Sequence, residues 1–468
     1  MTKRYILKIS FIVLVALTLQ GCFVAKDYER PQLETVSEAL YRTNNLPQDS
    51  TSMADMSWKS LFTDAVLVAH IETGLVNNLD IRIALQQIEA ANAYYRQGKA
   101  GNLPTFGVTA QVTHQELSRN SQFGAFFDGG ITQYDLSGNL SWEADIWGKI
   151  RSNQRASGAA YLQSVAAHQA VKTQLVANIA TLYYQLATLD EQLRIVEETI
   201  ENRSSSLETT KALKDAGLLT EVAVKQTEAQ LYNAQALQLD LKRDIALTEN
   251  TFSILLGASS QRIERNALEN QQLEADLKIG YPMQLLRNRP DVMAAEYGLV
   301  QAFEMTNVAR SQFYPSLSIS ATSGFQSLEL DQWLSANSIF ANFVGGLTQP
   351  ILNGRRIKTQ YEVAQAQQEQ AFLEFKKAML TASKEVSDAM YSYTNAEAKI
   401  AIKTKEFEAY SDATTYSEDL LDNGLANYLE VLTSRENSLN SQVSVTNAKF
   451  EKLQAIVELY RALGGGWK

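Results

Sequence analysis

The segment FYPSLSISA, residues 313–321, decides the fold because the sequence contains it twice in slightly different form. The earlier copy is NLPTFGVTA, residues 102–110, which also has a proline at its third position. Similar helical stretches precede both copies: NLDIRIALQQIEAANA begins at Asn78, and RPDVMAAEYGLVQAFE begins at Arg289. Two similar stretches in the same order indicate an internal duplication.

The duplication continues to the end of the chain. GLLTEVAVKQTEAQL from Gly217 matches GLANYLEVLTSRENS from Gly424. Each half therefore contains a helix, two alternating segments, a very long helix, a tight glycine turn and a long returning helix. We predict five segments in chain order: a signal peptide at 1–21, an N-terminal arm and belt at 22–76, the first repeat at 77–258, an equatorial linker at 259–287 and the second repeat at 288–468.

The alternating segments have the period of a β-strand. In the first, Phe106, Val108 and Ala110 alternate with polar residues, and in the third Leu317 and Ile319 do the same. Each of the four segments is about 9–11 residues long, the length of a tilted strand that spans a membrane. The alternation fits a half-buried sheet in a soluble protein equally well, so both interpretations remain open at this point.

The segments after the strands predict long helices. Apolar residues recur every three or four positions from Leu175 to Ile200 and continue past Arg203 to Leu207, which is a heptad pattern sustained over several repeats. A second heptad pattern runs from Leu429 to Tyr460, with Glu436 and Thr446 as polar interruptions. We predict a helix from about Ile150 to Leu213, roughly 95 Å long at 1.5 Å per residue. Such a helix must pack along other long helices, because no compact domain accommodates it.

The two glycine turns predict where the helices end. Gly217 and Gly424 stand where a helix C-terminus favours glycine. Thr220 and Asn427 follow at the same distance and are good N-cap residues for the returning helices.

Composition excludes several classes of function. The formal net charge is −10, which argues against nucleic acid as a partner, because phosphate binding needs clustered Lys and Arg. The three histidines, His70, His114 and His168, are scattered, and no metal-binding spacing or phosphate-binding glycine loop is visible. The sequence therefore predicts a protein that is not an enzyme and needs no cofactor.

The N-terminus predicts export. Residues 1–21 combine a basic start with an apolar core, which is typical of a bacterial signal peptide, and the single cysteine, Cys22, follows at the expected cleavage point. We predict that Cys22 receives a diacylglycerol and becomes the mature N-terminus. The alternative is an ordinary signal peptide with an incidental cysteine.

Four strands per chain lead to a prediction about assembly. They cannot close a barrel, and an open sheet cannot lie in lipid with unpaired backbone edges. If the strands are in a membrane, several chains must share one barrel. Two chains would give a barrel filled by its own side chains, whereas three would give twelve strands and room for a lumen, with apolar residues facing lipid and polar residues facing water.

Five features of the sequence occur together: Cys22, WKSLFTDAVL from Trp58, RPDVMAAE from Arg289, FYPSLSIS from Phe313 and LYRALGGGW from Leu459. In these residues the mature chain resembles the TolC/OprM-type outer-membrane efflux factors, in their lipidated branch. The resemblance implies a mainly α-helical chain with a membrane β-barrel: a homotrimer whose twelve-stranded barrel in the outer membrane continues as a periplasmic α-helical barrel. It further implies the exit duct of a tripartite pump, joined by a periplasmic adaptor to an inner-membrane transporter of the RND type.

The resemblance also implies a gate at the periplasmic tip. Leu429 matches the family's apolar ring, Glu430 matches a position that carries an acid, and Thr433 falls where an aspartate is common. Glu430 has a second interpretation, since Asn427 and Glu430 have the spacing of a capping box. By the same match, Gly217–Leu218 and Gly424–Leu425 are the expected adaptor-docking tips.

Two other functions remain as alternatives. The first is the outer-membrane duct of a type I protein secretion system. The second is a coiled-coil structural lipoprotein without a channel. Neither the exported substrate nor the role of Phe123, Phe126 and Phe127, in an expected extracellular loop, follows from the sequence.

Overall fold

The computed structural model of the chain describes residues 24–31, 52–122, 124, 130–271, 273 and 284–468. The predicted signal peptide, Cys22 and the three phenylalanines of the expected extracellular loop lie outside these residues. The chain divides into two compact units. We call them the strand unit, which comprises residues 1–31, 89–163 and 295–374, and the helix unit, which comprises 32–88, 164–294 and 375–468.

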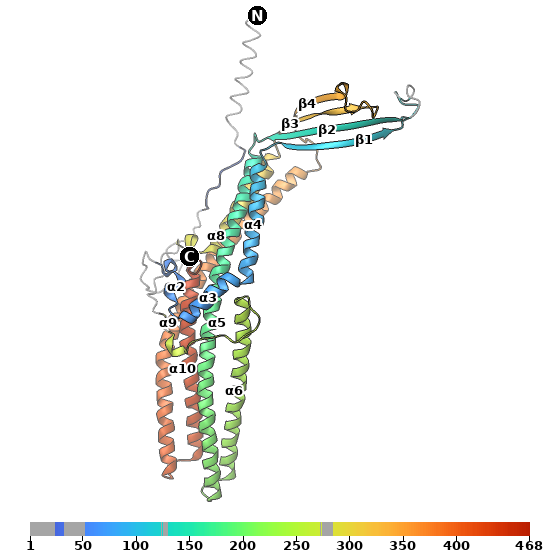
Figure 1. The fold of residues 1–468 in the computed structure, drawn as a ribbon. Helices are drawn as coiled ribbons and strands as arrows, with labels where there is room; N and C mark the ends of the chain where they lie inside the picture. The colour runs from blue at the N-terminus through green and yellow to red at the C-terminus, as the bar shows by residue number, and fades with distance from the viewer. Residues whose placement is uncertain (1–23, 32–51, 123, 125–129, 272, 274–283) are drawn as a thin grey trace. The chain divides into compact units, whose positions relative to one another are not determined.

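The strand unit contains one antiparallel sheet in which all four predicted strands are present (Figure 1). The strands lie in the order β1-β2-β3-β4, so each pairs with its neighbour in sequence. Their bounds are Thr105–Gln115 for β1, Ile131–Ala144 for β2, Ser316–Ser327 for β3 and Ile339–Thr348 for β4, and the short helix η5, Ala336–Ser338, precedes β4. β1 and β4 are therefore edge strands within the chain.

The register separates the sheet into an apolar and a polar face. Phe106 pairs with Leu140, which pairs with Ala321 and through it with Phe343, so one row of apolar residues crosses all four strands. On the opposite face the Asn139 side chain lies within hydrogen-bond distance of Thr109 and Thr322 on both neighbouring strands. The period of two therefore predicted the two faces of β1, β2 and β3, because cross-strand partners in a sheet lie on the same face. In β4 the alternation is less regular, since Phe340 and Val344 lie on the polar face with Asn342.

The helices of the strand unit pack closely through aromatic rings. They are the C-terminal part of α4, Leu79–Ala100, the start of α5, Lys149–Asp215, most of α8, Pro290–Ser311, and the start of α9, Arg356–Asp422. Tyr95 stacks on Tyr161 with ring centroids 5.9 Å apart, and Phe313 meets Tyr361 edge-on at 5.6 Å. Trp147 donates a 2.8 Å hydrogen bond to the Pro315 carbonyl at the entry to β3.

The helix unit contains two long antiparallel hairpins, α5–α6 and α9–α10 (Figure 1). Its further elements are η2, Met53–Asp55, α2, Trp58–Leu61, α3, Ala65–Asn77, α6, Glu221–Leu255, η3, Leu268–Asn270, α7, Leu285–Asn288, and α10, Tyr428–Ala462. The largest fully buried side chains of the described residues belong to this unit: Tyr183, Tyr184, Phe62, Phe252, Phe375, Leu67, Ile71, Ile179, Leu186, Leu285 and Met379. Among the described residues, none of the helices combines the length and the hydropathy of a transmembrane span.

The predicted turn residues end and begin the helices as expected. Gly217 and Gly424 have φ angles of 75° and 72°, the left-handed conformation that costs glycine little. The residue after each glycine closes the turn by donating to a helix carbonyl, at 2.9 Å for Leu218 and 2.8 Å for Leu425. The side chain of Thr220 caps α6 and that of Asn427 caps α10, so both N-cap predictions are confirmed.

The glycines near the C-terminus permit close packing in the helix unit. Gly464 has a φ of 94°, and a Cβ there would collide with the Asn288 carbonyl. Trp467 donates to the same carbonyl at 3.0 Å, and Tyr460 donates to the Met56 carbonyl at 2.8 Å. The C-terminus is thereby fixed against α7 and the segment before α2.

Candidate functional site: the hairpin tips

The two hairpin turns of the helix unit form the candidate site. A groove of about 760 Å³ lies between them. Its lining is mostly apolar and comes from both turns: Leu213, Leu218, Leu219, Thr220, Val222, Ala223, Gln226, Leu421, Gly424, Ala426, Asn427, Tyr428 and Leu429. The predicted docking residues Leu218 and Gly424 and the predicted gate residue Leu429 therefore meet at one groove.

The apolar side chains at the turns are unusually exposed. The exposed fraction is 72% for Leu218, 77% for Leu425, 64% for Val222 and 52% for Leu429. Burial of apolar surface is favourable by roughly 25 cal/mol per Å², so an exposed cluster of this kind is typical of a surface that contacts a partner.

The three predicted gate residues lie on the first turns of α10. Leu429 and Glu430 are exposed, and the exposed Thr433 donates from Oγ1 to the Leu429 carbonyl at 2.8 Å. Asn427 accepts from the Leu429 amide at 2.8 Å, but Glu430 does not bond back to Asn427, and its carboxylate has no partner among the described residues. Asn427 therefore caps α10 alone, and the capping-box interpretation of Glu430 is wrong in its second half.

Tyr428, which the sequence did not single out, joins the two hairpins. Its hydroxyl lies 3.1 Å from Oγ1 of Thr210 on α5 and 2.6 Å from Oγ1 of Thr227 on α6. The corresponding residue of the first repeat is Glu221 and not a tyrosine, so comparing the two halves of the sequence does not predict this contact. The start of α10, where the predicted gate residues lie, is thereby held to the other hairpin.

A buried arginine continues the connection between the hairpins. Arg203 on α5, only 4% exposed, donates to the Gln230 carbonyl on α6 and to Glu436 on α10, both at 2.7 Å. Arg203 and Glu436 each interrupt the apolar heptad pattern of their helix. In the structure these two residues pair with each other. The pairing is expected, because an unpaired charge buried between helices would be very costly.

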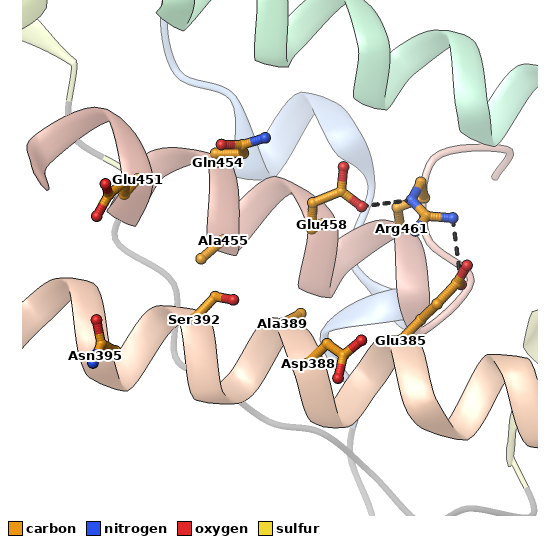
Figure 2. Close-up of a pocket in the computed structure, with 10 residues that line it drawn as sticks. All are labelled: Glu385, Asp388, Ala389, Ser392, Asn395, Glu451, Gln454, Ala455, Glu458 and Arg461. Carbon is orange, nitrogen blue, oxygen red and sulfur yellow. Dashed lines mark hydrogen bonds and ion pairs between the residues drawn. The ribbon is translucent and has the colours of Figure 1, made fainter. Parts of the chain in front are cut away.

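A second groove, of about 410 Å³, lies between α9 and α10 and is rich in carboxylates (Figure 2). Arg461 on α10 pairs with Glu458 at 2.8 Å and with Glu385 on α9 at 3.4 Å. Glu451 pairs with Lys399 at 2.8 Å. The pairs of Arg461 with Glu385 and of Glu451 with Lys399 fasten α9 to α10. Among the described residues, no group of three or more His, Cys, Asp or Glu side chains is arranged to hold a metal ion.

Asp64 organises the belt of the helix unit. One carboxylate oxygen accepts from the Val66 amide at 2.8 Å, and the other accepts from Tyr183 at 2.7 Å and from Gln271 at 2.6 Å. Burial alone would raise the pKa of Asp64, but the hydrogen bonds from Gln271 and Tyr183 outweigh it, so the pKa lies below its ordinary value. The charged form is therefore the one that the fold stabilises.

We expect Asp64→Asn to lower the free energy of unfolding at neutral pH by about 2 kcal/mol, because hydrogen bonds to a charged acceptor are lost. The folded-state pKa is lowered, so this stabilisation is complete above the ordinary pKa of 3.8 and disappears as the pH falls through the lowered value. Guanidinium unfolding of both proteins, followed by circular dichroism, measures the difference at each pH.

Glu72→Gln serves as the control, because Glu72 pairs with Lys59 on the exposed surface and such pairs contribute little. A wild-type advantage over Asp64→Asn that stays constant into strongly acid solution would contradict the proposed role of the carboxylate.

The comparisons with known proteins agree with the fold. The family model for outer membrane efflux proteins matches residues 71–258 and 281–465. The cation efflux system protein CusC of Escherichia coli O6:H1 is 26% identical over 97% of this chain and 98% of its own length. The solvent efflux pump outer membrane protein SrpC of Pseudomonas putida is 28% identical over 98% of both chains.

Solved structures show the same architecture. The outer-membrane channel OprN superimposes with a TM-score of 0.87 at 25% identity, over 95% of this chain and all of that one. A CusC structure gives a TM-score of 0.84 at 25% identity, over 94% of this chain and 99% of that one. With a family model that matches both halves and an architecture shared over nearly the full length, the chain belongs to the outer membrane efflux protein family.

Proposed function

We propose that three copies of this outer-membrane efflux channel share one twelve-stranded barrel and form the exit duct of a tripartite pump. The observation that carries the shared barrel is the sheet of the strand unit, which leaves β1 and β4 unpaired along their outer edges within the chain. Three copies give twelve strands, which leave room for a lumen. Backbone groups cannot remain unpaired in lipid, so β1 of one copy must pair with β4 of the next.

The faces of the sheet support this arrangement. Phe106, Val108 and Phe343 are 68%, 67% and 79% exposed, and they all lie on the apolar face. Water is a poor solvent for such a face, whereas the hydrocarbon of a bilayer suits it. The opposite face, with Asn139, Thr109 and Thr322, suits a water-filled lumen.

The helix unit carries a matching surface for assembly. Tyr232, Leu239, Leu247 and Ile254 on α6 are 58%, 68%, 56% and 69% exposed and recur at spacings of seven or eight residues. A heptad row of exposed apolar residues is what a helix presents to another helix in a coiled coil. We infer that this row packs against the neighbouring copy.

The remaining components follow from the same proposal. The groove between the hairpin tips, with Leu218 and Leu425 exposed beside it, is the docking surface for a periplasmic adaptor that links the duct to an inner-membrane pump of the RND type. Leu429, Glu430 and Thr433 narrow the duct near its periplasmic end. Cys22 carries a lipid in the outer membrane. The duct conducts passively and needs no catalytic group.

Two neighbouring residues of β1 test the orientation of the barrel. We expect Val108→Arg to reduce trimer yield strongly, because an arginine facing lipid near the middle of the bilayer costs about 2–4 kcal/mol per chain. Thr109→Arg, on the opposite face, should leave the trimer intact and make its conductance in planar bilayers less cation-selective. Gel electrophoresis of the cross-linked protein and single-channel recording measure the two effects.

The proposal fails if purified wild-type protein is monomeric and gives no conductance, which is the behaviour of a structural lipoprotein without a channel. Equal effects of the two arginines would show that the two faces of the sheet are not lipid and lumen.

A further inference from the structure

The first described residues, 24–31, lie along helix α8 in the strand unit and are bound there through their backbone. The Asn307 side chain on α8 accepts from the Lys26 amide at 3.1 Å and donates to the Lys26 carbonyl at 2.9 Å. One carboxamide thus bonds both main-chain groups of one residue, as a neighbouring strand would do. The Lys26 side chain itself is exposed.

Asn307 is held rigidly for this role. It is 1% exposed, and it also donates to Glu304 at 3.2 Å and accepts from Arg310 at 3.4 Å. Both donor hydrogens and both acceptor sites of the amide are therefore in use, which fixes its orientation. Glu304, 2% exposed, is in turn held by two hydrogen bonds from Arg155 on α5, at 2.6 and 2.9 Å.

Further contacts extend the bound segment on both sides of Lys26. Arg310 donates to the Val24 carbonyl at 3.4 Å, and the Val24 side chain is buried. The Tyr28 ring meets Phe303 edge-on at 5.6 Å. Arg30 forms a two-pronged pair with Glu296 at 2.6 and 2.9 Å. The contacts follow α8 along its length, so the segment is docked and not merely adjacent.

We propose that Asn307, supported by Glu304 and Arg155, is a main-chain clamp that ties the N-terminal arm to α8. The proposal rests on the lipidation of Cys22, because its consequence is the position of the lipid anchor. Val24 is two residues after Cys22, and two residues span at most about 7 Å. Arg310 lies in the last turn of α8, shortly before β3 begins at Ser316. The clamp therefore holds Val24, the described residue nearest in sequence to the predicted lipidation site, beside the last turn of α8.

Limited proteolysis of the purified, membrane-extracted protein tests the clamp. Glu-C protease cleaves after Glu29, an exposed residue within the docked segment. We expect Asn307→Ala to be cleaved there about tenfold faster than the wild type, the change that the loss of two ordinary hydrogen bonds produces in the opened fraction. Lys26→Pro, which removes the donor from the arm and leaves α8 untouched, should also be cleaved faster.

Lys26→Ala is the matched control and should be cleaved at the wild-type rate, because the clamp contacts only the main chain of Lys26. If Asn307→Ala and Lys26→Pro both behave like the wild type, the clamp does not exist. Thiol titration separates this failure from that of the lipid proposal: Cys22 is the only cysteine, so a reactive thiol in the wild type means that the anchor is missing, whatever the proteolysis shows.

Discussion

Replacing Arg289 with methionine is expected to lower the free energy of unfolding by about 2–3 kcal/mol per chain, because a buried cation loses its charge-assisted hydrogen bonds to two partly exposed carboxylates. Arg289 is 4% exposed and lies in the helix unit, between α7 and α8. It forms a two-pronged pair with Asp291 at 2.6 and 3.0 Å, and it donates to Glu385 on α9 at 2.6 Å and to the Ala462 carbonyl at the end of α10 at 3.0 Å.

Acid should weaken the stabilisation that this network provides, as it does for Asp64. Burial alone would raise the pKa of Asp291, but the hydrogen bonds and charge of Arg289 outweigh it and hold the pKa below its ordinary value. The pair therefore stabilises the fold at neutral pH, and this contribution is lost as the pH falls through the lowered pKa. In Arg289→Met the pKa of Asp291 should rise.

Denaturant unfolding of the purified protein, followed by the helical circular dichroism signal, measures the loss of stability. Lys384→Met is the matched control: Lys384 pairs with Asp388 one turn along the exposed surface of α9, and such pairs contribute about 0.5 kcal/mol or less. Arg289→Lys should lie between the wild type and Arg289→Met, because lysine keeps the charge but cannot form the two-pronged contact. Equal stability of the wild type and Arg289→Met would contradict the central role of the network.

Opening the predicted gate should give the largest change in transport. We expect the double variant Leu429→Ala, Glu430→Ala to raise single-channel conductance, roughly doubling it, because three copies of each side chain would no longer narrow the pore. Both side chains are exposed at the start of α10, and the Glu430 carboxylate has no partner in the described part of the chain, so its charge is free to face the lumen.

Two variants separate the contributions of size and charge. Glu430→Gln should keep the pore dimensions and reduce the preference for cations, because the ring of negative charge is removed. Val222→Ala changes the residue that matches Leu429 in the first repeat, is likewise exposed, and should leave conductance unchanged if only the second turn lines the constriction. If the double variant conducts like the wild type, the constriction lies elsewhere in the duct.

The sequence predicted the features that depend on neighbouring residues in the chain. The period of two gave the four strands and their apolar and polar faces, because side chains in a strand must alternate. The glycines at 217 and 424 gave the hairpin turns, because a left-handed residue at a helix end favours glycine. The residues that carry the family resemblance predicted the function of an outer-membrane efflux channel.

The two compact units of the structure do not coincide with the two repeats of the sequence. Each unit takes segments from both halves of the sequence, since α5 and α9 each run through both units. The duplication records how the chain is built, whereas the contacts within each unit depend on how the two copies pack together.

Only the tertiary structure decided which polar side chains meet. Arg203 and Glu436 looked like separate interruptions of two heptad patterns, and Asn307 and Lys26 lie far apart in the sequence, yet each pair is in contact. Such contacts depend on the rotation and axial register of packed helices, which no local periodicity encodes. The sequence determined the strands, the turns and the faces of the sheet, because these arise from the geometry of adjacent residues. The clamp, the Arg289 network and the Tyr428 contact needed the fold, because burial makes a polar group find a partner without specifying from which element it comes.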